Sequence, residues 1–477
     1  MSKSTSYSSS SGPGTQLDWQ SEDAGQGSKA ASKNAKATNV GGQPHRIVIV
    51  GGGAAGIELA TRLGDRFRKG TQAGVTLVDA AMAHLWKPML HEVAAGSLDP
   101  GKYELNYLEH AHRHGFRYHF GAMVGLDRTA KMLRLSATYD HDQREISPSR
   151  LLPYDTLVIA IGSRANDFGI PGVIANAYPL ENTSQAVRFN QKLIHACLRA
   201  QTQDQPLRPG QLHIVVVGAG ATGTELVAEL HHTMRQIVSR GLDRIDPERD
   251  IQITLMDSAE RILPALPERI SKKAHQLLSG LDVNVRTNAR VTEVSELGLK
   301  LSNGTFIAAE MVVWAAGVKG APVLQQLDGL EVTRTNQLVV EPTLQTPRDP
   351  DIFAIGDCAA CPIQGQTFLV PPRAQAAHQQ AEHMLGQIER RLKRKPLLPF
   401  EYKDFGSLVS LGAHGTVGKL MKRTAGSGIF IEGFLAKWAY SSLRVMHERS
   451  LHGIFGSLLR VLVRIISRYV GPRVKLH

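Results

Sequence analysis

The sequence predicts an α/β fold with two parallel sheets, because one pattern of strand, turn and helix occurs twice in the chain. The pattern reads RIVIVGGGAAGIELATRL from Arg46 and HIVVVGAGATGTELVAEL from His213. Each unit leads to another apolar strand, VTLVD or IQITLMD, and strands that alternate with helices are typical of parallel sheets. The 477 residues suffice for two or three domains with cores of their own.

The first unit has the spacing of a dinucleotide-binding turn. Gly51, Gly53 and Gly56 form G-x-G-x-x-G between the strand and the helix, and Asp79 ends the next strand. The first two glycines allow a tight turn and a close approach to a pyrophosphate, and the third allows the helix to pack on the strand. We expect the Asp79 carboxylate to bind a ribose hydroxyl.

The second unit repeats this device with Gly218, Gly220, Gly223 and Asp257. Two sites in one chain imply two different dinucleotides, and transfer of a hydride from a soluble nicotinamide to a retained flavin explains the presence of both. Asp257 follows Gly223 by 34 positions, more than the usual spacing of about 20, because the crossover is longer. The first arginine after Asp257 is Arg261, so no arginine directly follows the aspartate to bind the 2′-phosphate of NADPH. This spacing favours NADH over NADPH.

Three later segments have the form of a strand that runs into a turn of small residues. They are YDTLVIAIGS, which contains Gly162, MVVWAAGV, which contains Gly317, and DIFAIGDCA, which contains Asp357. With the two glycine turns and the stretch AQAAHQ, they make the chain resemble flavoproteins with two dinucleotide-binding domains, and specifically the bacterial type II NADH dehydrogenases. The resemblance covers about residues 45–477 and includes LWKPMLHEVAAGSLDP.

The resemblance implies two cofactors and the residues that hold them. It assigns FAD to Gly51, Gly53, Gly56, Asp79 and Asp357, and NADH to Gly218, Gly220, Gly223, Glu225 and Asp257. Gly162, Gly317 and Ala374 complete the predicted cofactor-binding residues. Glu225 faces the nicotinamide in such enzymes. Its alternative interpretation is an acid in the first helical turn, where the helix dipole favours a carboxylate.

The stretch VPPRAQAAHQQ predicts a helix that begins near Arg373. Its positive end would face the flavin and stabilise negative charge in the reduced cofactor. Gln375 and Gln379 are four positions apart and share one helical face, where their amides can donate to quinone carbonyls. In the resembling enzymes this A-Q-x-A-x-Q pattern lines the quinone pocket. The alternative is a helix with solvated glutamines, and for His378 both a protonic and a structural role stay open.

Cys358 and Cys361 form C-x-x-C and offer a competing function, a pyridine-nucleotide disulfide reductase. In those relatives the pair lies on the first FAD helix or in the NADPH domain, and the first helix here has no cysteine. A zinc site would need two further ligands. The sequence therefore predicts structural cysteines and no metal, and a total of three cysteines suits a reducing cytosol.

The C-terminal segment is basic and amphipathic. The net charge of the chain is +12, and residues 431–477 hold eight Lys or Arg against two Glu, so they contribute +6. Arg460, Arg464 and Arg468 interrupt GIFGSLLRVLVRIISRYV, so no apolar stretch reaches the ~18 residues of a membrane span. We predict docking of this helix, and of FLAKWAYSSLRVMHERS before it, on an anionic membrane surface. A core helix or a homodimer contact is the alternative, and nucleic acid is disfavoured because the arginines alternate with aliphatic residues.

These observations predict five segments. They are a disordered leader at 1–44, the first part of the FAD domain at 45–165, the NADH domain at 166–319, the second part of the FAD domain at 320–400, and a membrane-associated region at 401–477. The predicted reaction passes a hydride from NADH to FAD and then two electrons to a membrane quinone. We expect the protein to be peripheral on the cytoplasmic face of the membrane and to translocate no protons.

Overall fold

The computed structural model describes residues 43–470, apart from residues 71, 141, 413–414 and 422–427. The predicted leader at 1–44 lies outside these residues except for its last two positions. Ordered structure was expected from His45, and the first strand begins at this residue.

The first sheet has six strands in the order β23-β24-β11-β1-β2-β5. Five of them run parallel and β23 is antiparallel to its neighbour. The strands are β1 (His45–Val50), β2 (Ala73–Asp79), β5 (Arg117–Phe120), β11 (Thr156–Ile159), β23 (Gln345–Thr346) and β24 (Asp349–Ala354). Successive residues of β1 and β11 are buried because helices cover parallel sheets on both faces.

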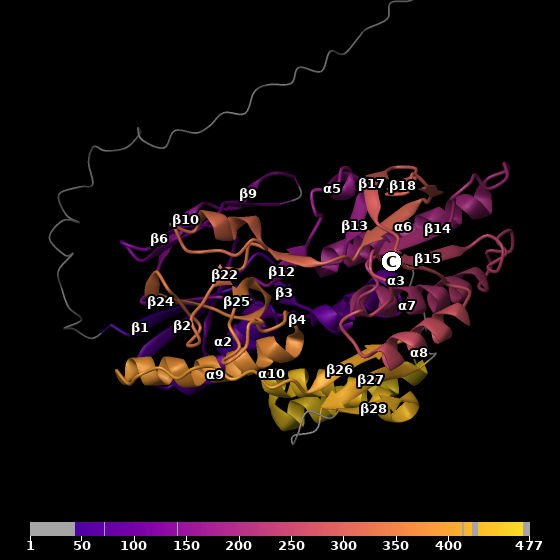
Figure 1. The fold of residues 1–477 in the computed structure, drawn as a ribbon. Coiled ribbons are helices and arrows are strands. Elements are labelled where there is room, and N and C mark those ends of the chain that lie inside the picture. The colour runs from indigo at the N-terminus through magenta and orange to yellow at the C-terminus, as the bar shows by residue number, and fades with distance from the viewer. Residues whose placement is uncertain (1–42, 71, 141, 413–414, 422–427, 471–477) are drawn as a thin grey trace, which may run out of the picture. The chain divides into compact units, whose positions relative to one another are not determined.

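Two long helices pack against each other beside this sheet, although they are far apart in the sequence. They are α2 (Ala54–Phe67) and α9 (Ala374–Leu392). In Figure 1 both lie along the lower side of the sheet. The first sheet is therefore built from strands that end by Ile159 and strands that begin at Gln345 or later.

The second sheet has five strands, all parallel, in the order β13-β20-β14-β15-β16. The strands are β13 (Ala177–Pro179), β14 (His213–Val217), β15 (Gln252–Met256), β16 (Asn284–Arg286) and β20 (Met311–Trp314). Its helices are α6 (Thr183–Thr202), α7 (Ala221–Val238) and α8 (Glu268–Ser279). The predicted α/β fold with two sheets of parallel strands is confirmed.

Two paired strands connect the first sheet with the second: the chain leaves the first sheet through one strand and returns through the other. β12 (Ser163–Ala165) pairs antiparallel with β21 (Val318–Gly320). A short helix of the first domain, α3 (Leu90–Ala95), packs against α6 and α7 of the second. The described residues from Pro44 onward accordingly form one compact unit.

Smaller elements complete these two parts. The short helices are α4 (Tyr107–His114) and α5 (Val173–Asn176), with 3-10 turns η1 (Lys87–Met89), η2 (Pro100–Lys102), η3 (Pro322–Gln326) and η4 (Gly356–Cys358). The short strands are β3 (Ala83–His84), β4 (Leu105–Asn106), β6 (Met123–Asp127), β7 (Met132–Leu135), β8 (Thr138–Tyr139), β9 (Glu145–Ser147), β10 (Arg150–Pro153), β17 (Val291–Ser295), β18 (Gly298–Leu301), β19 (Phe306–Ala308), β22 (Leu338–Val339) and β25 (Ala359–Ala360).

The C-terminal region consists of an antiparallel sheet and one long, interrupted helix. The strands are β26 (Gly406–Ser410), β27 (Thr416–Met421) and β28 (Gly428–Glu432), and the helix is α10 (Gly433–Val470). Gly453 has a φ of 69° and divides α10 into two helices. The two predicted amphipathic elements are these two helices. A search of the described residues for a helix long and apolar enough to cross a membrane finds none.

The C-terminal region contributes to two hydrophobic cores, one beside each parallel sheet. Leu451 of α10 belongs to the core of the first domain, whereas Val409, Leu411 and Val417 belong to the core of the second. Ala436 and Leu451 are buried, so the first half of α10 packs on the protein, in line with the core-helix alternative in the sequence analysis.

Candidate functional site

Both glycine turns have the same backbone geometry. Gly51 and Gly218 adopt φ values of +101° and +106°, which only glycine reaches without strain. A Cβ on Gly56 would lie 1.8 Å from the Gly51 carbonyl oxygen, and one on Gly223 would lie 2.0 Å from that of Gly218. The first and third glycines of each turn are therefore required by the fold itself.

The middle glycine of each turn borders open space. A Cβ built on Gly53 or Gly220 would meet no atom within 4 Å. These residues are the N-caps of α2 and α7, and neither helix has a side chain that caps its N-terminus. Free backbone N–H groups beside an open cradle bind phosphate, so both turns fit the pyrophosphate of a dinucleotide. Gly162, with a φ of +71°, also borders open space.

The two aspartates occupy equivalent places. The Gly52 N–H donates to Asp79 Oδ2 over 2.5 Å, and the Ala219 N–H donates to Asp257 Oδ2 over 2.7 Å. Each aspartate also accepts from the N–H two positions further on, over 2.7 Å and 2.9 Å. Burial raises the pKa of Asp79, and the two N–H donors lower it. The long crossover before Asp257 thus leaves its position beside the turn unchanged.

Asp357 lies in a turn that three other side chains support. Ser163 Oγ donates to Asp357 Oδ2 over 2.8 Å, and Lys87 Nζ donates to the Ser163 carbonyl over 3.1 Å. The buried Gln380 side chain accepts from the Gly356 N–H over 2.6 Å. Sequence reasoning missed these supporting residues, although Ser163 directly follows Gly162 and Gln380 stands out as a polar side chain on the buried face of α9.

Gly317 and Ala374 differ from the other predicted cofactor residues. A Cβ on Gly317 would lie 2.6 Å from the Phe168 ring, so this glycine is packed against a side chain. Ala374 is the first residue of α9, which has Arg373 as its N-cap, as the sequence predicted. No side chain caps α9 and its first turn holds no acid, and α9 contacts η4, the turn that holds Asp357.

Gln375 and Gln379 lie on one side of α9, where they bind the segment before β26. Gln375 Nε2 donates to Asp404 Oδ1 over 3.1 Å and to the Gly406 carbonyl over 3.2 Å. Gln379 Nε2 donates to the Lys403 carbonyl over 2.8 Å, and its Oε1 accepts from the Lys403 N–H over 2.9 Å. Gln375 thus uses both amide hydrogens, whereas one amide hydrogen of Gln379 has no acceptor among the described residues.

Glu225 lies where four elements meet. Helix α7 begins at Ala221, so Glu225 is in its second turn, which corrects the expectation of the first turn and weakens the helix-dipole interpretation. The side chain is buried, and it accepts from the Ser410 N–H of β26 over 3.0 Å. His91 Nδ1 of α3 lies 3.6 Å from Oε2, and Tyr440 of α10 forms a side-chain hydrogen bond. Burial raises the pKa of Glu225, and these three partners lower it.

His378 forms an ion pair with a carboxylate in the core. Its Nδ1 lies 2.6 Å from Glu58 Oε2 of α2, and the Glu58 side chain is fully buried. Arg62 Nε donates to Glu58 Oε1 over 2.9 Å. The hydrogen bond to Glu58 raises the pKa of His378, although burial lowers it.

The cysteines do not have the properties of a redox pair. All three are buried free thiols, and burial raises the pKa of each to about 12. Cys358 Sγ contacts the carbonyl oxygens of Ile159 and Ile355 at 3.4 Å and 3.2 Å. A thiolate is the reactive species, so the disulfide-reductase alternative receives no support. Among the described residues, no three His, Cys, Asp or Glu side chains are arranged to hold a metal ion.

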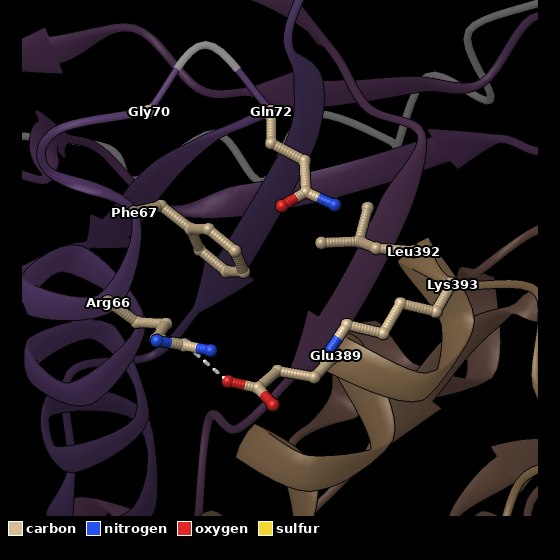
Figure 2. A pocket seen from close by; sticks show the side chains of 7 residues that line it. All are labelled: Arg66, Phe67, Gly70, Gln72, Glu389, Leu392 and Lys393. Carbon is tan, nitrogen blue, oxygen red and sulfur yellow. Dashed lines mark hydrogen bonds and ion pairs between the residues drawn. The ribbon is translucent and has the colours of Figure 1, made fainter.

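A cavity of about 210 Å³ lies apart from these residues, at the C-terminal ends of α2 and α9 (Figure 2). Arg66 and Glu389 form an ion pair of 2.5 Å at its edge. Its other lining residues are Phe67, Gly70, Gln72, Leu392 and Lys393. The glycine turn is at the opposite end of α2, so this cavity is not part of the candidate site.

Comparisons with known proteins agree with this geometry. The family model of pyridine nucleotide-disulphide oxidoreductases matches residues 45–381. The type II NADH:quinone oxidoreductase of Haemophilus influenzae is 43% identical over 443 residues, which cover 90% of this chain and 99% of that protein. The type II NADH:quinone oxidoreductase NdhA of Mycobacterium tuberculosis is 28% identical, with 80% of each chain covered.

Solved structures share the fold. NDH2 of Plasmodium falciparum in complex with NADH has a TM-score of 0.75 at 19% identity and covers 91% of this chain and 100% of its own. The sulfide:quinone oxidoreductase of Aquifex aeolicus has a TM-score of 0.66 at 16% identity and covers 86% of this chain and 92% of its own. With its two nucleotide cradles and its similarity over nearly its whole length, the chain belongs to the pyridine nucleotide-disulphide oxidoreductases and, among them, to the type II NADH:quinone oxidoreductases.

Proposed function

We propose that the protein transfers a hydride from NADH to bound FAD and then two electrons to a membrane quinone, without translocating protons. FAD and NADH are the cofactors of this family. The observation that carries the proposal is the duplicated cradle, in which Gly53 and Gly220 border open space at two helix N-termini. Two cradles on two sheets allow a retained dinucleotide and an exchangeable one.

FAD is assigned to the first cradle. Asp79 and Gly53 would hold its ribose and pyrophosphate, and Asp357 would hold the part beyond them. When bound, FAD supplies a carrier that accepts a hydride and releases two electrons. The uncapped N-terminus of α9 presents backbone N–H groups beyond Asp357, and these would stabilise negative charge there.

NADH is assigned to the second cradle, and Asp257 would bind its ribose hydroxyls. Arg261 is the first arginine after Asp257, and its guanidinium donates to the carbonyl oxygens of Pro264 and Leu266 over 2.8 Å. This arginine is therefore engaged with its own loop instead of a 2′-phosphate. The arrangement favours NADH over NADPH. Glu225, five positions along α7 from Gly220, would face the nicotinamide.

The quinone is assigned to the side of α9 that carries Gln379. This glutamine keeps one amide hydrogen after binding Lys403, and an amide can donate to a quinone carbonyl without ionising. Gln375 would mainly hold the segment before β26 in place, because both of its amide hydrogens are bonded to this segment. The segment before β26 would then form one wall of the quinone site.

Attachment to the cytoplasmic face of the membrane is assigned to α10. The large apolar side chains of α10 that are exposed, among those described, are Phe434, Leu435, Trp438, Met446, Ile454, Phe455, Leu458, Leu459, Leu462, Val463 and Ile466. Arg460 is exposed among them, whereas the side chains of Arg464 and Arg468 lie outside the described residues. An exposed apolar face with cations lies in the headgroup region of an anionic leaflet. A homodimer contact is the alternative use of this face.

One experiment tests the proposed function. The purified protein should show the absorption spectrum of bound flavin, bleach on addition of NADH under argon, and recover its colour on addition of a short-chain quinone. A protein that contains no flavin, or whose flavin NADH does not bleach, would refute the enzyme assignment. If NADH bleaches the flavin but a quinone does not reoxidise it, the assignment of the NADH site stands and the quinone is excluded as the electron acceptor.

A further inference from the structure

Glu58 and His378 form an ion pair that the proposed function has not used. Glu58 points from α2 into the first core and is fully buried, and a carboxylate is rarely placed there without a compensating partner. His378 Nδ1 at 2.6 Å and Arg62 Nε at 2.9 Å are its two partners. The His378 side chain remains 21% exposed, so one end of the pair is in the core and the other reaches the surface of α9.

His378 lies on α9 between Gln375 and Gln379, which bind the segment before β26. Residues three and four positions apart are neighbours on a helix, so His378 borders the same side of α9 as Gln375. Arg373, the N-cap of α9, contacts Asp404 of the proposed quinone wall over 3.6 Å but stays protonated, whereas the His378 imidazole beside these glutamines can release a proton near neutral pH.

The overall reaction needs one proton from outside the substrates. NADH provides two electrons and the equivalent of one proton as a hydride, whereas a quinone needs two electrons and two protons to become a quinol. The remaining proton must reach a quinone oxygen from the protein or from water. A positioned side chain that is protonated near neutral pH speeds such a transfer.

We propose that His378, held by Glu58, donates this proton to the quinone, an inference that rests on the proposed quinone site beside α9. The Nε2–H bond breaks, its electron pair stays on the imidazole ring, and an O–H bond forms on the quinone, whose two electrons come from NADH. Nε2 is the donor atom because Nδ1 is held by Glu58. The exposed part of the ring then takes a new proton from water.

The surroundings of His378 favour its protonated form. Glu58 of α2 and Glu382 of α9 itself favour the protonated ring, and Arg62 of α2 opposes them. His447 of α10 also faces this site, but it stays neutral because burial lowers its pKa well below the ordinary value. Since the hydrogen bond to Glu58 raises the pKa of His378, the ring is protonated further into the neutral range than a free histidine.

The test compares His378→Gln with His383→Gln in stopped-flow reoxidation of the NADH-reduced protein by a short-chain quinone. His383 is a matched control on the same helix, where its Nε2 bonds the Leu398 carbonyl over 3.1 Å. We expect His378→Gln to slow reoxidation by about 100-fold, the lower range for a general acid. His383→Gln should stay within about twofold of the parent, and bleaching by NADH should be unchanged in both.

The pH dependence separates a proton donor from a structural side chain. In the parent, reoxidation should fall as the pH rises through the His378 pKa. Glu58→Gln removes the main cause of the raised pKa, so the fall should move to lower pH, and NMR titration of the ring in the oxidised protein should show the same shift. Added imidazole should restore reoxidation in His378→Ala. A pH profile that Glu58→Gln leaves in place, or no rescue, would overturn the inference.

A third variant keeps the inference distinct from the proposed function. If Gln379→Ala and His378→Gln both leave reoxidation unchanged, the quinone does not bind beside α9 and the proposed site fails. If Gln379→Ala slows reoxidation while His378→Gln behaves like the His383 control, the site stands and His378 is not its proton donor.

Discussion

Asp257 has two tasks at once, because it holds the glycine turn and would hold the ribose. Asp257→Ala removes the acceptor for Ala219 and for the nicotinamide ribose, and each hydrogen bond to a charged group contributes about 1.5–3 kcal/mol. We expect kcat/KM for NADH to fall by about 10-fold or more and that for NADPH to fall less or rise, since the 2′-phosphate no longer meets a carboxylate. Initial rates with both nucleotides check this. Equal efficiencies in the parent would refute it.

Cys358 and Cys361 should be dispensable for electron transfer. The double variant Cys358→Ser, Cys361→Ser keeps a hydrogen-bond donor at each site, and burial argues against thiolate chemistry in the parent. We expect flavin content and most NADH:quinone activity to remain, with a loss of stability of about 1 kcal/mol per site from burying hydroxyls. Activity that disappears while flavin stays bound would return the disulfide-reductase class to consideration.

The residues differ in how much of their role the sequence could reveal. Gly51 and Gly218 were predictable because a positive φ and the close backbone that follows β11 or β20 leave no alternative to glycine. The partners of Glu225 were not, since Ser410 is 185 positions away and its contact depends on how β26 packs. The supporting roles of Gln380 and Ser163 were missed for the same reason. Short sequence motifs reveal local backbone constraints, whereas long-range contacts depend on the tertiary fold.

Helix α9 and the segment before β26 act as a unit, which affects how a glutamine variant should behave. Gln379→Ala should slow reoxidation by quinone several-fold, because one hydrogen bond to a neutral carbonyl contributes about 0.5–1.5 kcal/mol. FAD content and bleaching by NADH should remain nearly intact. Stopped-flow measurement of the two half-reactions checks this, and a loss confined to the NADH half-reaction would place Gln379 on the nicotinamide side.

Gln375→Ala provides the comparison within the same element. Gln375 has both amide hydrogens bound to the segment before β26, so its loss should loosen this wall without removing a quinone donor. We expect a smaller effect on the reoxidation rate at saturating quinone and a higher KM for quinone. The sequence predicted the helix and its start correctly, but it could not show that its glutamines bind residues more than twenty positions away.

Buried histidines contribute to the packing of the first half of α10. They predict that the folded protein loses stability in acid. His84 Nε2 and His447 Nε2 lie 3.1 Å apart, and Trp86 stacks on His447. Burial lowers the pKa of His84 to about 4 and that of His447 well below its ordinary value. The folded pKa is below the unfolded value, so stability should be constant above about pH 6.5 and should fall as the pH drops toward 4.

For His84 alone the loss approaches about 3 kcal/mol at pH 4, by the conversion of pKa shifts to free energy. The measurement is the thermal midpoint between pH 7.5 and 4 for the parent and for His84→Gln, which cannot take up a proton. We expect a flatter profile for the variant, although it is less stable at neutral pH. Parallel profiles would show that His84 does not contribute to acid lability.

At the scale of the whole molecule, Gly453 divides α10 into a part that reaches the first core through Leu451 and a part with many exposed apolar side chains, for which we propose membrane docking. Deleting residues 453–477 should release the protein from membranes and preserve FAD and NADH oxidation by a soluble acceptor. Deleting residues 433–477 removes Leu451 from the first core and should cost FAD and stability as well. Sedimentation with vesicles and the flavin spectrum check both. Loss of FAD in the shorter deletion would place the second half of α10 in the core or in a dimer contact.

Charge reversal tests the electrostatic part of docking. Each cation near an anionic surface contributes about 1 kcal/mol, so changing Arg460, Arg464 and Arg468 to Glu should weaken binding to anionic vesicles strongly and to neutral vesicles much less. High salt should reproduce only part of the loss, because screening leaves the apolar insertion in place. Equal weakening on both kinds of vesicle would contradict an electrostatic role.

The strands of the second sheet lie in sequence between β11 and β23 of the first sheet. This order affects how the chain folds while it is being synthesised. A ribosome delivers the chain from its N-terminus at about 5–20 residues per second. The second sheet is complete once β20 emerges, whereas the first sheet still waits for β24, whose last residue follows the end of β11 by 354 − 159 = 195 positions. For about 10 to 40 s the nascent chain therefore carries an open edge at β11. Such edges pair with other chains, so a cell that makes this enzyme has to shield that strand until its neighbour arrives.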